Sequence, residues 1–243
     1  MLKFYLMILF LYSIFGRFLQ LLPKYKIINI LNMKSKFYAP INNHYVNLDL
    51  RRLKSGRREL KTIKWLNQIP NNSVYFDVGT DYGQEVVLLS SLVEKNIKIF
   101  GFDCSLLPAH YCSINNEVNN NKFEFTFAAV SDQSGKIMEF TALSNLSIKS
   151  KYTYKVMTLS LDDFCKIKKI FPTHLKIDVD GGELKVIKGA ENVLNNSMLR
   201  EIYIEIDDYN KEEIFNILKV KGFENIWTVP NKKNSDYFFK KIL

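Results

Sequence analysis

Two short clusters of acids and glycines contain residues whose types and spacing could do chemistry. In the first, an apolar run ends at Asp77 and is followed by Gly79 and Gly83, with Asp81 between the glycines. A second apolar run ends at Asp103, twenty residues after Gly83. A strand, a glycine loop, a helix and a strand that ends in a carboxylate form the nucleoside-binding half of a doubly wound α/β fold. We therefore expect the glycines to let the backbone approach a ligand closely, and Asp103 to accept hydrogen bonds from ribose hydroxyls.

The acid inside the glycine loop helps to choose between two kinds of nucleoside ligand. The loop from Gly79 to Gly83 lacks the third glycine of the dinucleotide motif, and Asp81 would repel a pyrophosphate. An acid there is compatible with a cationic ligand such as S-adenosylmethionine, whose sulfonium and amino groups are positive. The loop favours a methyl donor, and an oxidoreductase that binds NAD or a nucleotide sugar is the first alternative.

A second acidic cluster lies in the segment from Leu175 to Glu183. Because side chains alternate along a strand, Lys176, Asp178 and Asp180 share one side if the strand continues to the glycines that follow. The carboxyl end of a central strand is where open α/β sheets bind ligands. We expect Asp178 and Asp180 to act as the base or to orient the substrate, with Lys176 positioning them or the substrate. The paired acids could alternatively hold a divalent cation, although the His and Cys residues show no metal-binding spacing and no metal site is predicted.

Alternating strands and helices must position these residues. Apolar runs predict strands at about 74–78, 98–103, 123–130, 136–141, 174–179, 200–206, 223–228 and 236–242. Helical patterns occupy about 60–69, 84–94, 106–117, 183–194 and 211–221, and Ser160 is expected to cap a further helix. The polar segment 142–154 is expected to be a mobile loop over the site. This alternation predicts a mostly parallel α/β sheet that is finished by a hairpin-like pair.

Basic residues are concentrated at the start of the chain. Residues 1–70 contain 13 Lys and Arg against 2 Asp and Glu, whereas residues 71–243 contain 21 against 23. An enzyme that acts on nucleic acid is expected to have a basic working face. The nearly neutral second part therefore argues against a nucleic-acid partner.

The basic N-terminal part begins with an uncharged apolar run, Phe4–Gly16, which can be continued through Arg17 to Leu22. The shorter run is typical of a helix lying in the membrane interface, and the longer one would make a short single span. A helix packed on the domain or on a partner is the third reading. Lysines follow downstream, which places the domain on the cytoplasmic face of a membrane. We accordingly divide the chain into a membrane-associating segment (1–36), a basic helical lead-in (37–70) and a catalytic domain (71–243).

Five motifs, in order, resemble those of the FkbM-type family of S-adenosylmethionine-dependent methyltransferases. They lie at 76–83, 100–103, 128–135, 158–163 and 175–190. The resemblance implies a class I methyltransferase fold, with a Rossmann-like, mostly parallel seven-stranded sheet and helices on both faces. It also implies O-methylation of a sugar or polyketide hydroxyl, with Asp77 near the methionyl part of the donor and Asp132 near the adenine. Asp180 stands where the family usually has Glu, which affects the identity of the substrate more than the fold.

Together these observations predict an O-methyltransferase whose acceptor is a small molecule or a glycan. An acceptor that is itself linked to lipid would suit a membrane-associated enzyme, by analogy alone. A catalytically inactive, membrane-associated binding module is the second alternative, because the glycine loop departs from the family pattern at Thr80–Tyr82.

Overall fold

The computed structural model describes residues 24–57, 60–143, 151–230 and 234–242. The strands of this part are β1 (Tyr25–Ile30), β2 (Met33–Tyr38), β3 (Val74–Val78), β4 (Lys98–Asp103), β5 (Glu124–Phe127), β6 (Ala129–Val130), β7 (Ile137–Leu143), β8 (Lys151–Leu159), β9 (His174–Ile177), β10 (Glu201–Asp207), β11 (Phe223–Pro230) and β12 (Asn234–Lys241). The helices are α2 (His44–Lys54), α3 (Leu60–Gln68), α4 (Gln84–Leu89), α5 (Leu106–Val118), α6 (Leu161–Lys168), α7 (Glu183–Lys188), α8 (Glu191–Asn195) and α9 (Lys211–Val220).

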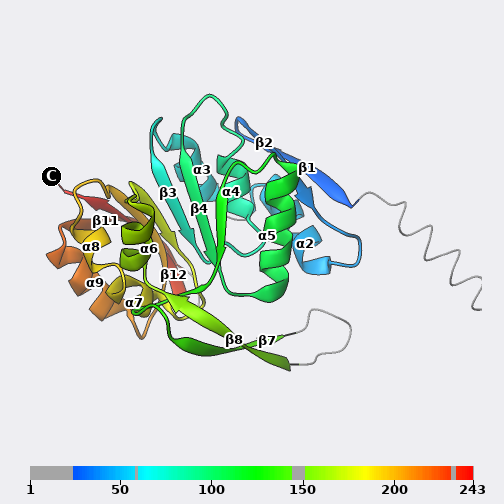
Figure 1. Cartoon of the computed structure of the whole chain (residues 1–243). Helices are drawn as coiled ribbons and strands as arrows, with labels where there is room; N and C mark the ends of the chain where they lie inside the picture. Colours follow the sequence, from blue (N-terminus) through cyan, green and yellow to red (C-terminus); the bar gives the residue numbers. More distant parts are fainter. Residues whose placement is uncertain (1–23, 58–59, 144–150, 231–233, 243) are drawn as a thin grey trace, which may run out of the picture.

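The central sheet has seven strands in the order β11-β12-β10-β9-β3-β4-β5 (Figure 1). Strands β10, β9, β3, β4 and β5 pair in parallel, and β12 runs antiparallel to both of its neighbours. The chain moves outward from β3 to β5 and then returns to β9 beside β3. This reversal leaves a crevice at the carboxyl ends of β3 and β9, where open α/β sheets bind ligands. The predicted mostly parallel seven-stranded sheet is confirmed.

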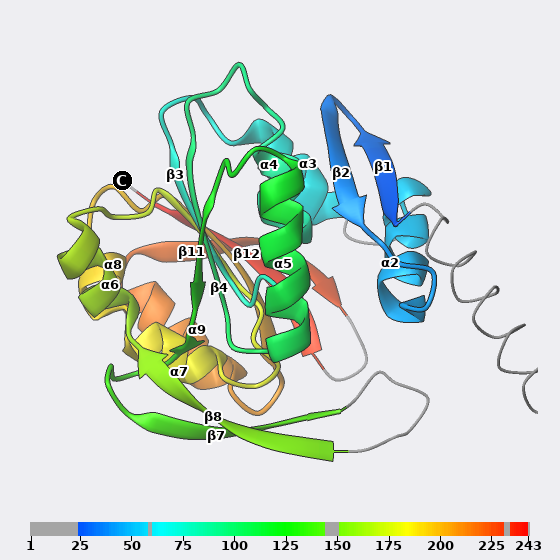
Figure 2. The same cartoon turned by 45° about the vertical axis from the view of Figure 1, so that its right-hand side comes forward.

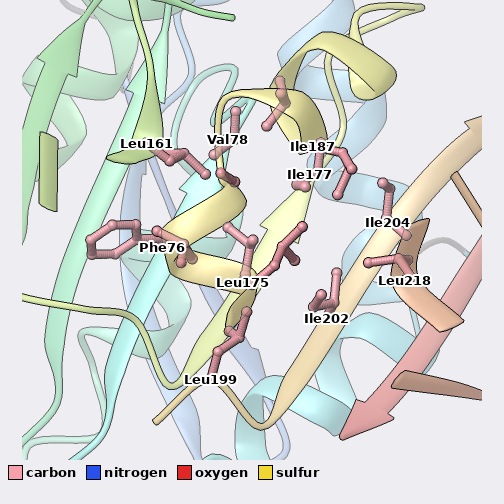
Figure 3. Close-up of a cluster of buried hydrophobic side chains, with 14 of the residues drawn as sticks. Phe76, Val78, Leu161, Leu175, Ile177, Ile187, Leu199, Ile202, Ile204 and Leu218 are labelled. Atoms are coloured by element: carbon pink, nitrogen blue, oxygen red, sulfur yellow. The ribbon is translucent and has the colours of Figure 1, made fainter. Parts of the chain in front are cut away.

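Both faces of the sheet are covered by helices. Alternate strand residues such as Phe76, Leu175 and Ile202 pack with α6, α7 and α9 in one apolar core (Figure 3). The intervening residues, among them Tyr75 and Tyr203, pack with α3 and α4 in a second core on the opposite face. Figure 2 shows these two layers on either side of the strands. Because both faces are buried, the strands read as continuous apolar runs in which a charged residue is conspicuous.

An antiparallel hairpin, β1–β2, precedes the helices of the domain and was not anticipated from the sequence. Its inward residues Ile28, Met33 and Phe37 are buried in the second core. The predicted boundary between residues 36 and 37 thus falls inside β2, and the domain includes the hairpin. Lys34 and Lys36, which the sequence places in the membrane-associating segment, alternate with buried residues of β2 and point outward.

The segment expected to be a loop over the site is partly strand. Residues Ile137–Leu143 pair with Lys151–Leu159, and Ala129–Val130 adds a short third strand to this smaller sheet. Residues 142–143 and 151–154 of the expected loop are therefore strand, and the residues between them, 144–150, lie outside the described part of the chain. Many Thr and Tyr side chains favour a strand here, as β-branched and aromatic residues do.

The predicted N-terminal apolar helix, Phe4–Leu22, also lies outside the described residues. Within the residues that the structure describes, no helix is long and apolar enough to span a membrane.

Candidate functional site

A cavity of about 680 Å³ lies at the crevice of the sheet. The ends of β3, β4 and β9 supply its floor through Val78, Asp103 and Asp178, and Met138 and Phe140 of β7 form part of its wall. Its lining includes six Asp or Glu residues and two lysines, namely Asp49, Asp81, Glu85, Asp103, Asp178, Asp180, Lys176 and Lys185. The cavity is thus an acidic space at the position that the strand order predicts for a ligand.

The glycine loop after β3 is held tightly against the neighbouring strands. The backbone N–H groups of Gly79 and Thr80 both donate to the carbonyl of Phe102, at 2.9 and 3.0 Å. Gly79 has φ +85°, and a Cβ there would lie 1.6 Å from the carbonyl oxygen of Asp178. Glycine at this position is therefore required by the approach of β9. The sequence suggested that Gly79 is needed for a close approach to the ligand, and the packing against Asp178 is a second requirement for glycine there.

Asp103 ends β4, lines the cavity and is half-buried. One of its carboxylate oxygens accepts from the backbone N–H of Asp81 at 2.8 Å, and the other accepts from that of Ser105 at 2.6 Å. Burial raises the pKa of Asp103, and these hydrogen bonds oppose the rise. The carboxylate is fixed in orientation, and each of its oxygens has a second lone pair available to a hydroxyl ligand.

Asp77 and Lys176 form a buried ion pair between the two central strands. They face each other in the register of β3 and β9, and the Lys176 ammonium lies 3.4 Å from Oδ1 of Asp77. Burial raises the pKa of Asp77 to about 6, because desolvation outweighs the attraction of Lys176. Burial alone would lower the pKa of Lys176, but Asp77 and Asp178 raise it well above its usual value. Asp77 is fully buried and is not part of the cavity lining, so the structure does not bring this residue into the cavity with the other predicted donor residues.

Asp178 and Asp180 both line the cavity with Lys176. The Lys176 ammonium is 3.4 Å from Asp178 Oδ2, so it bridges Asp77 and Asp178. The strand ends at Ile177, earlier than predicted, and the chain then turns with Asp180 at φ +55°. Burial raises the pKa of Asp180, and the charges of Asp178 and Asp207 raise it further. The three residues are therefore brought together as expected, although through a turn and not through a continued strand.

Glu183 holds that turn and was underestimated from the sequence. Its Oε1 accepts from the backbone N–H of Gly181 at 2.9 Å and from that of Val179 at 3.3 Å. The sequence suggested a favourable first-turn acid of the following helix, which it also is. An acid five residues beyond the strand-terminal Asp178, directly after two glycines, is the signal that could have indicated a turn-holding role.

Two side chains of α2 also line the cavity, Tyr45 and Asp49. They are four residues apart and therefore share a helix face. The sequence indicates only a basic lead-in at this helix, and these two residues were not predicted as site residues. Their polar side chains among the basic residues of a helix were the available signal.

Asp132, by contrast, is exposed and lies outside the cavity lining, so the structure does not place it with the other predicted cofactor residues. Its neighbour Ser131 does line the cavity and donates a hydrogen bond to Asp132 at 3.0 Å. The carbonyl of Ser131 would lie 2.1 Å from a Cβ on Gly189. The Ala-Val-Ser-Asp turn is thus packed closely on the Gly189 end of α7.

Comparisons with known proteins identify the family. The sequence profile of the methyltransferase FkbM domain matches residues 107–228, half of the chain. The chain belongs to this family. The predicted family, a family of S-adenosylmethionine-dependent methyltransferases, is therefore confirmed.

Individual relatives are distant. A putative HD domain-containing protein of Acanthamoeba polyphaga mimivirus is 21% identical over 86% of this chain, which spans only 44% of that protein. Aeropyrum pernix fibrillarin, solved with natively bound S-adenosyl-L-methionine, has a TM-score of 0.50 and 12% identity, over 88% of this chain and 82% of its own. A putative rRNA methylase from Clostridium thermocellum has a TM-score of 0.50 and 14% identity, over 75% of this chain and 94% of its own. At these identities the two structures support the fold alone.

Proposed function

We propose that this chain transfers the methyl group of S-adenosylmethionine to a hydroxyl oxygen of an uncharged, polyhydroxylated acceptor such as a sugar or glycan. The observation that carries the proposal is the acidic cavity at the switch point of the sheet. Six acids and two lysines line it, so it suits a positive donor and repels an anionic acceptor. Carboxylates are also good acceptors for the hydrogen bonds of sugar hydroxyls.

The cavity fits the donor in size and in chemistry. Its volume of about 680 Å³ lies within the range of roughly 300–1,000 Å³ that is usual for small-molecule sites. Asp103 would hold the ribose, and the 79–83 loop with Asp81 would hold the positive end of the donor. Bound there, S-adenosylmethionine supplies an electrophilic methyl group on a sulfonium.

The acceptor side of the site is assigned to the turn after β9. A hydroxyl nucleophile must lose its proton during or after attack, and a carboxylate with a raised pKa is a better base than an ordinary one. Asp180 has that property and lines the cavity, so we assign it the proton. Asp178, half-exposed and beside the Lys176 ammonium, is assigned to orient the acceptor.

A direct test combines donor binding with acceptor screening. Isothermal titration calorimetry should detect binding of S-adenosylhomocysteine and no binding of NAD. Incubation of sugars and glycan extracts with isotopically labelled donor should then yield products heavier by one methylene. Binding of NAD in place of S-adenosylhomocysteine would refute the proposal. Labelling of phosphorylated acceptors in preference to neutral ones would refute its acceptor class.

A membrane-surface location on the cytoplasmic side remains part of the proposal, and a lipid-linked acceptor would suit it. Within residues 24–57 only Asp49 is acidic, whereas eight residues are basic, namely Lys24, Lys26, Lys34, Lys36, Arg51, Arg52, Lys54 and Arg57. Exposed apolar side chains accompany them, including Ile27 and Leu31 of the hairpin. Basic residues near an anionic bilayer each contribute roughly 1 kcal/mol, and exposed apolar groups add to the binding.

A further inference from the structure

Helix α2 contacts two consecutive residues of the glycine loop. The Tyr45 hydroxyl donates to Oδ2 of Asp81 at 2.8 Å. One turn further along, Oδ2 of Asp49 accepts from the Tyr82 hydroxyl at 2.5 Å. Because Tyr45 and Asp49 are four residues apart, one face of α2 makes both contacts. The helix itself is fixed, since Val46, Leu50 and Leu53 are buried in the second core.

The loop that these contacts hold has an unfavourable backbone conformation. Asp81 has φ +49°, in the left-handed region that residues other than glycine seldom adopt. In this conformation its N–H donates to Asp103, the acid assigned to the ribose. A change in the position of Asp81 would therefore also remove a hydrogen bond from Asp103. The contacts of α2 thus reach the donor-binding acid through one intervening residue.

The Asp49–Tyr82 hydrogen bond is buried inside the protein. Asp49 and Tyr82 are 3% and 2% exposed, respectively. A buried carboxylate needs a hydrogen-bond or charge partner, and the Tyr82 hydroxyl supplies one. Burial raises the pKa of Tyr82, and the nearby carboxylate of Asp49 raises it further, so its hydroxyl remains protonated and able to donate. The backbone carbonyl of Tyr82 is fixed in turn by the side-chain amide of Asn115 at 2.7 Å.

We propose that Tyr45 and Asp49 are positioning residues for donor binding, and that α2 is a required part of the methyl-donor site. Both residues lie well before the segment 107–228 that matches the family profile. The inference rests on the proposed function, because it assumes that the 79–83 loop and Asp103 hold the donor. It makes donor affinity depend on a helix that the family match does not include.

The test measures S-adenosylhomocysteine binding by calorimetry, and thermal unfolding without ligand, for a set of full-length variants. Tyr45→Phe removes only the hydroxyl of a side chain that is 43% exposed, so the fold should be retained. Loss of one hydrogen bond to a carboxylate should weaken binding roughly five- to tenfold, while the unfolding midpoint should fall by no more than about a few degrees. Tyr25→Phe is the matched control, because Tyr25 is an exposed hairpin tyrosine outside the cavity lining, and its binding should equal wild type.

Asp49 provides a second, independent arm. Asp49→Ala should weaken binding roughly tenfold or more, whereas Asp49→Asn should restore most of the affinity because its amide oxygen can still accept from Tyr82. If wild type binds but Tyr45→Phe binds equally well, the positioning role is refuted. If Asp49→Ala fails to fold, the Tyr45→Phe result decides. If wild type itself fails to bind S-adenosylhomocysteine, the proposed function fails first, and the two failures are distinguishable.

Discussion

Replacing Lys176 by Met should destabilise the protein severely, because the ammonium balances two carboxylates in the centre of the sheet. Lys176 is 3% exposed and Asp77 is fully buried, and each Nζ–Oδ distance from Lys176 to Asp77 and Asp178 is 3.4 Å. Among the described residues neither oxygen of Asp77 accepts a hydrogen bond, so the ion pair is the main compensation for its burial. Breaking a buried pair by removing one partner costs about 3–5 kcal/mol. We expect a loss of this size in the free energy of unfolding at pH 8.

The loss of stability in Lys176→Met should depend on pH through the protonation of Asp77. The pKa of Asp77 is about 6 in the folded protein, above the ordinary value of 3.8, because burial disfavours its charge. Without the ammonium that pKa rises further, and the folded variant then binds a proton that the unfolded chain releases. Stability should therefore increase as pH falls through the new pKa, since protonation removes the uncompensated charge. The Lys176→Met penalty should be largest at pH 8 and clearly smaller at pH 5.

Urea unfolding at pH 8 and pH 5 measures these losses in the free energy of unfolding. The variants to be compared with wild type are Lys176→Met, Asp77→Asn and the double variant. The double variant removes both charges, and replacing both partners of a buried pair is often close to neutral. It should thus be more stable than the sum of the single effects predicts, with a coupling of at least about 1 kcal/mol. The reasoning is refuted if Lys176→Met costs less than about 1 kcal/mol at pH 8, or if the two single effects simply add.

Four further predictions concern single features of the chain. Asp103→Ala should weaken S-adenosylhomocysteine binding by about 1.5–3 kcal/mol in calorimetry, and unchanged affinity in a folded variant would remove its ribose assignment. Asp180→Asn should lower turnover of an identified acceptor roughly 10²–10⁴-fold with little change in donor affinity. Turnover by the wild type should fall as the pH drops through the raised pKa of Asp180. A full rate in the variant would place the base elsewhere. Gly79→Ala should lower the free energy of unfolding by roughly 3 kcal/mol or more, because its Cβ would lie 1.6 Å from a carbonyl oxygen. Gly135→Ala, at φ +78° with nothing within 4 Å, should lower it by only about 1–2 kcal/mol. Equal losses in the two variants would contradict the clash. Removal of residues 1–23, which leaves the buried hairpin intact, should reduce flotation with anionic liposomes and preserve donor binding; equal flotation of both forms would contradict a membrane anchor.

The central strands and their acids could be predicted because a fully buried parallel sheet leaves a plain signal. The run at Val74–Val78 is observed with the predicted bounds, and Asp103 and Asp178 stand at strand ends where a charge is costly without a role or a partner. The cap at Ser160 is also confirmed, since its side chain accepts from the N–H of Asp163. These features depend on local chemistry that a single segment of sequence contains.

What could not be predicted depends on contacts between distant segments. The inward face of the β1–β2 hairpin alternates over few residues, and its lysines together with the apolar run before it suggested an anchor. Tyr45 and Asp49 acquire a role only because the fold brings α2 beside the 79–83 loop, some 35 residues away in sequence. The ion pair of Asp77 could not be predicted for the same reason. The position of Asp77 in its strand was predicted correctly, but its partner Lys176 lies on a strand about a hundred residues later.

The Asp77–Lys176 pair also indicates why the two halves of the site must be built together. Asp103 and the glycine loop, assigned to the donor, follow strands β3 and β4, whereas Asp178 and Asp180, assigned to the acceptor, follow β9. Strands β3 and β9 are adjacent, and the backbone N–H of Asp178 donates to the carbonyl of Val78 at 2.9 Å. Lys176 crosses this junction, contacting Asp77 on one strand and Asp178 at the mouth of the cavity. In-line methyl transfer depends on the spacing between donor and acceptor, and small misplacements are costly. The buried ion pair helps to fix that spacing where β3 and β9 meet, which is a reason for a charged pair where an apolar pair would have packed as well.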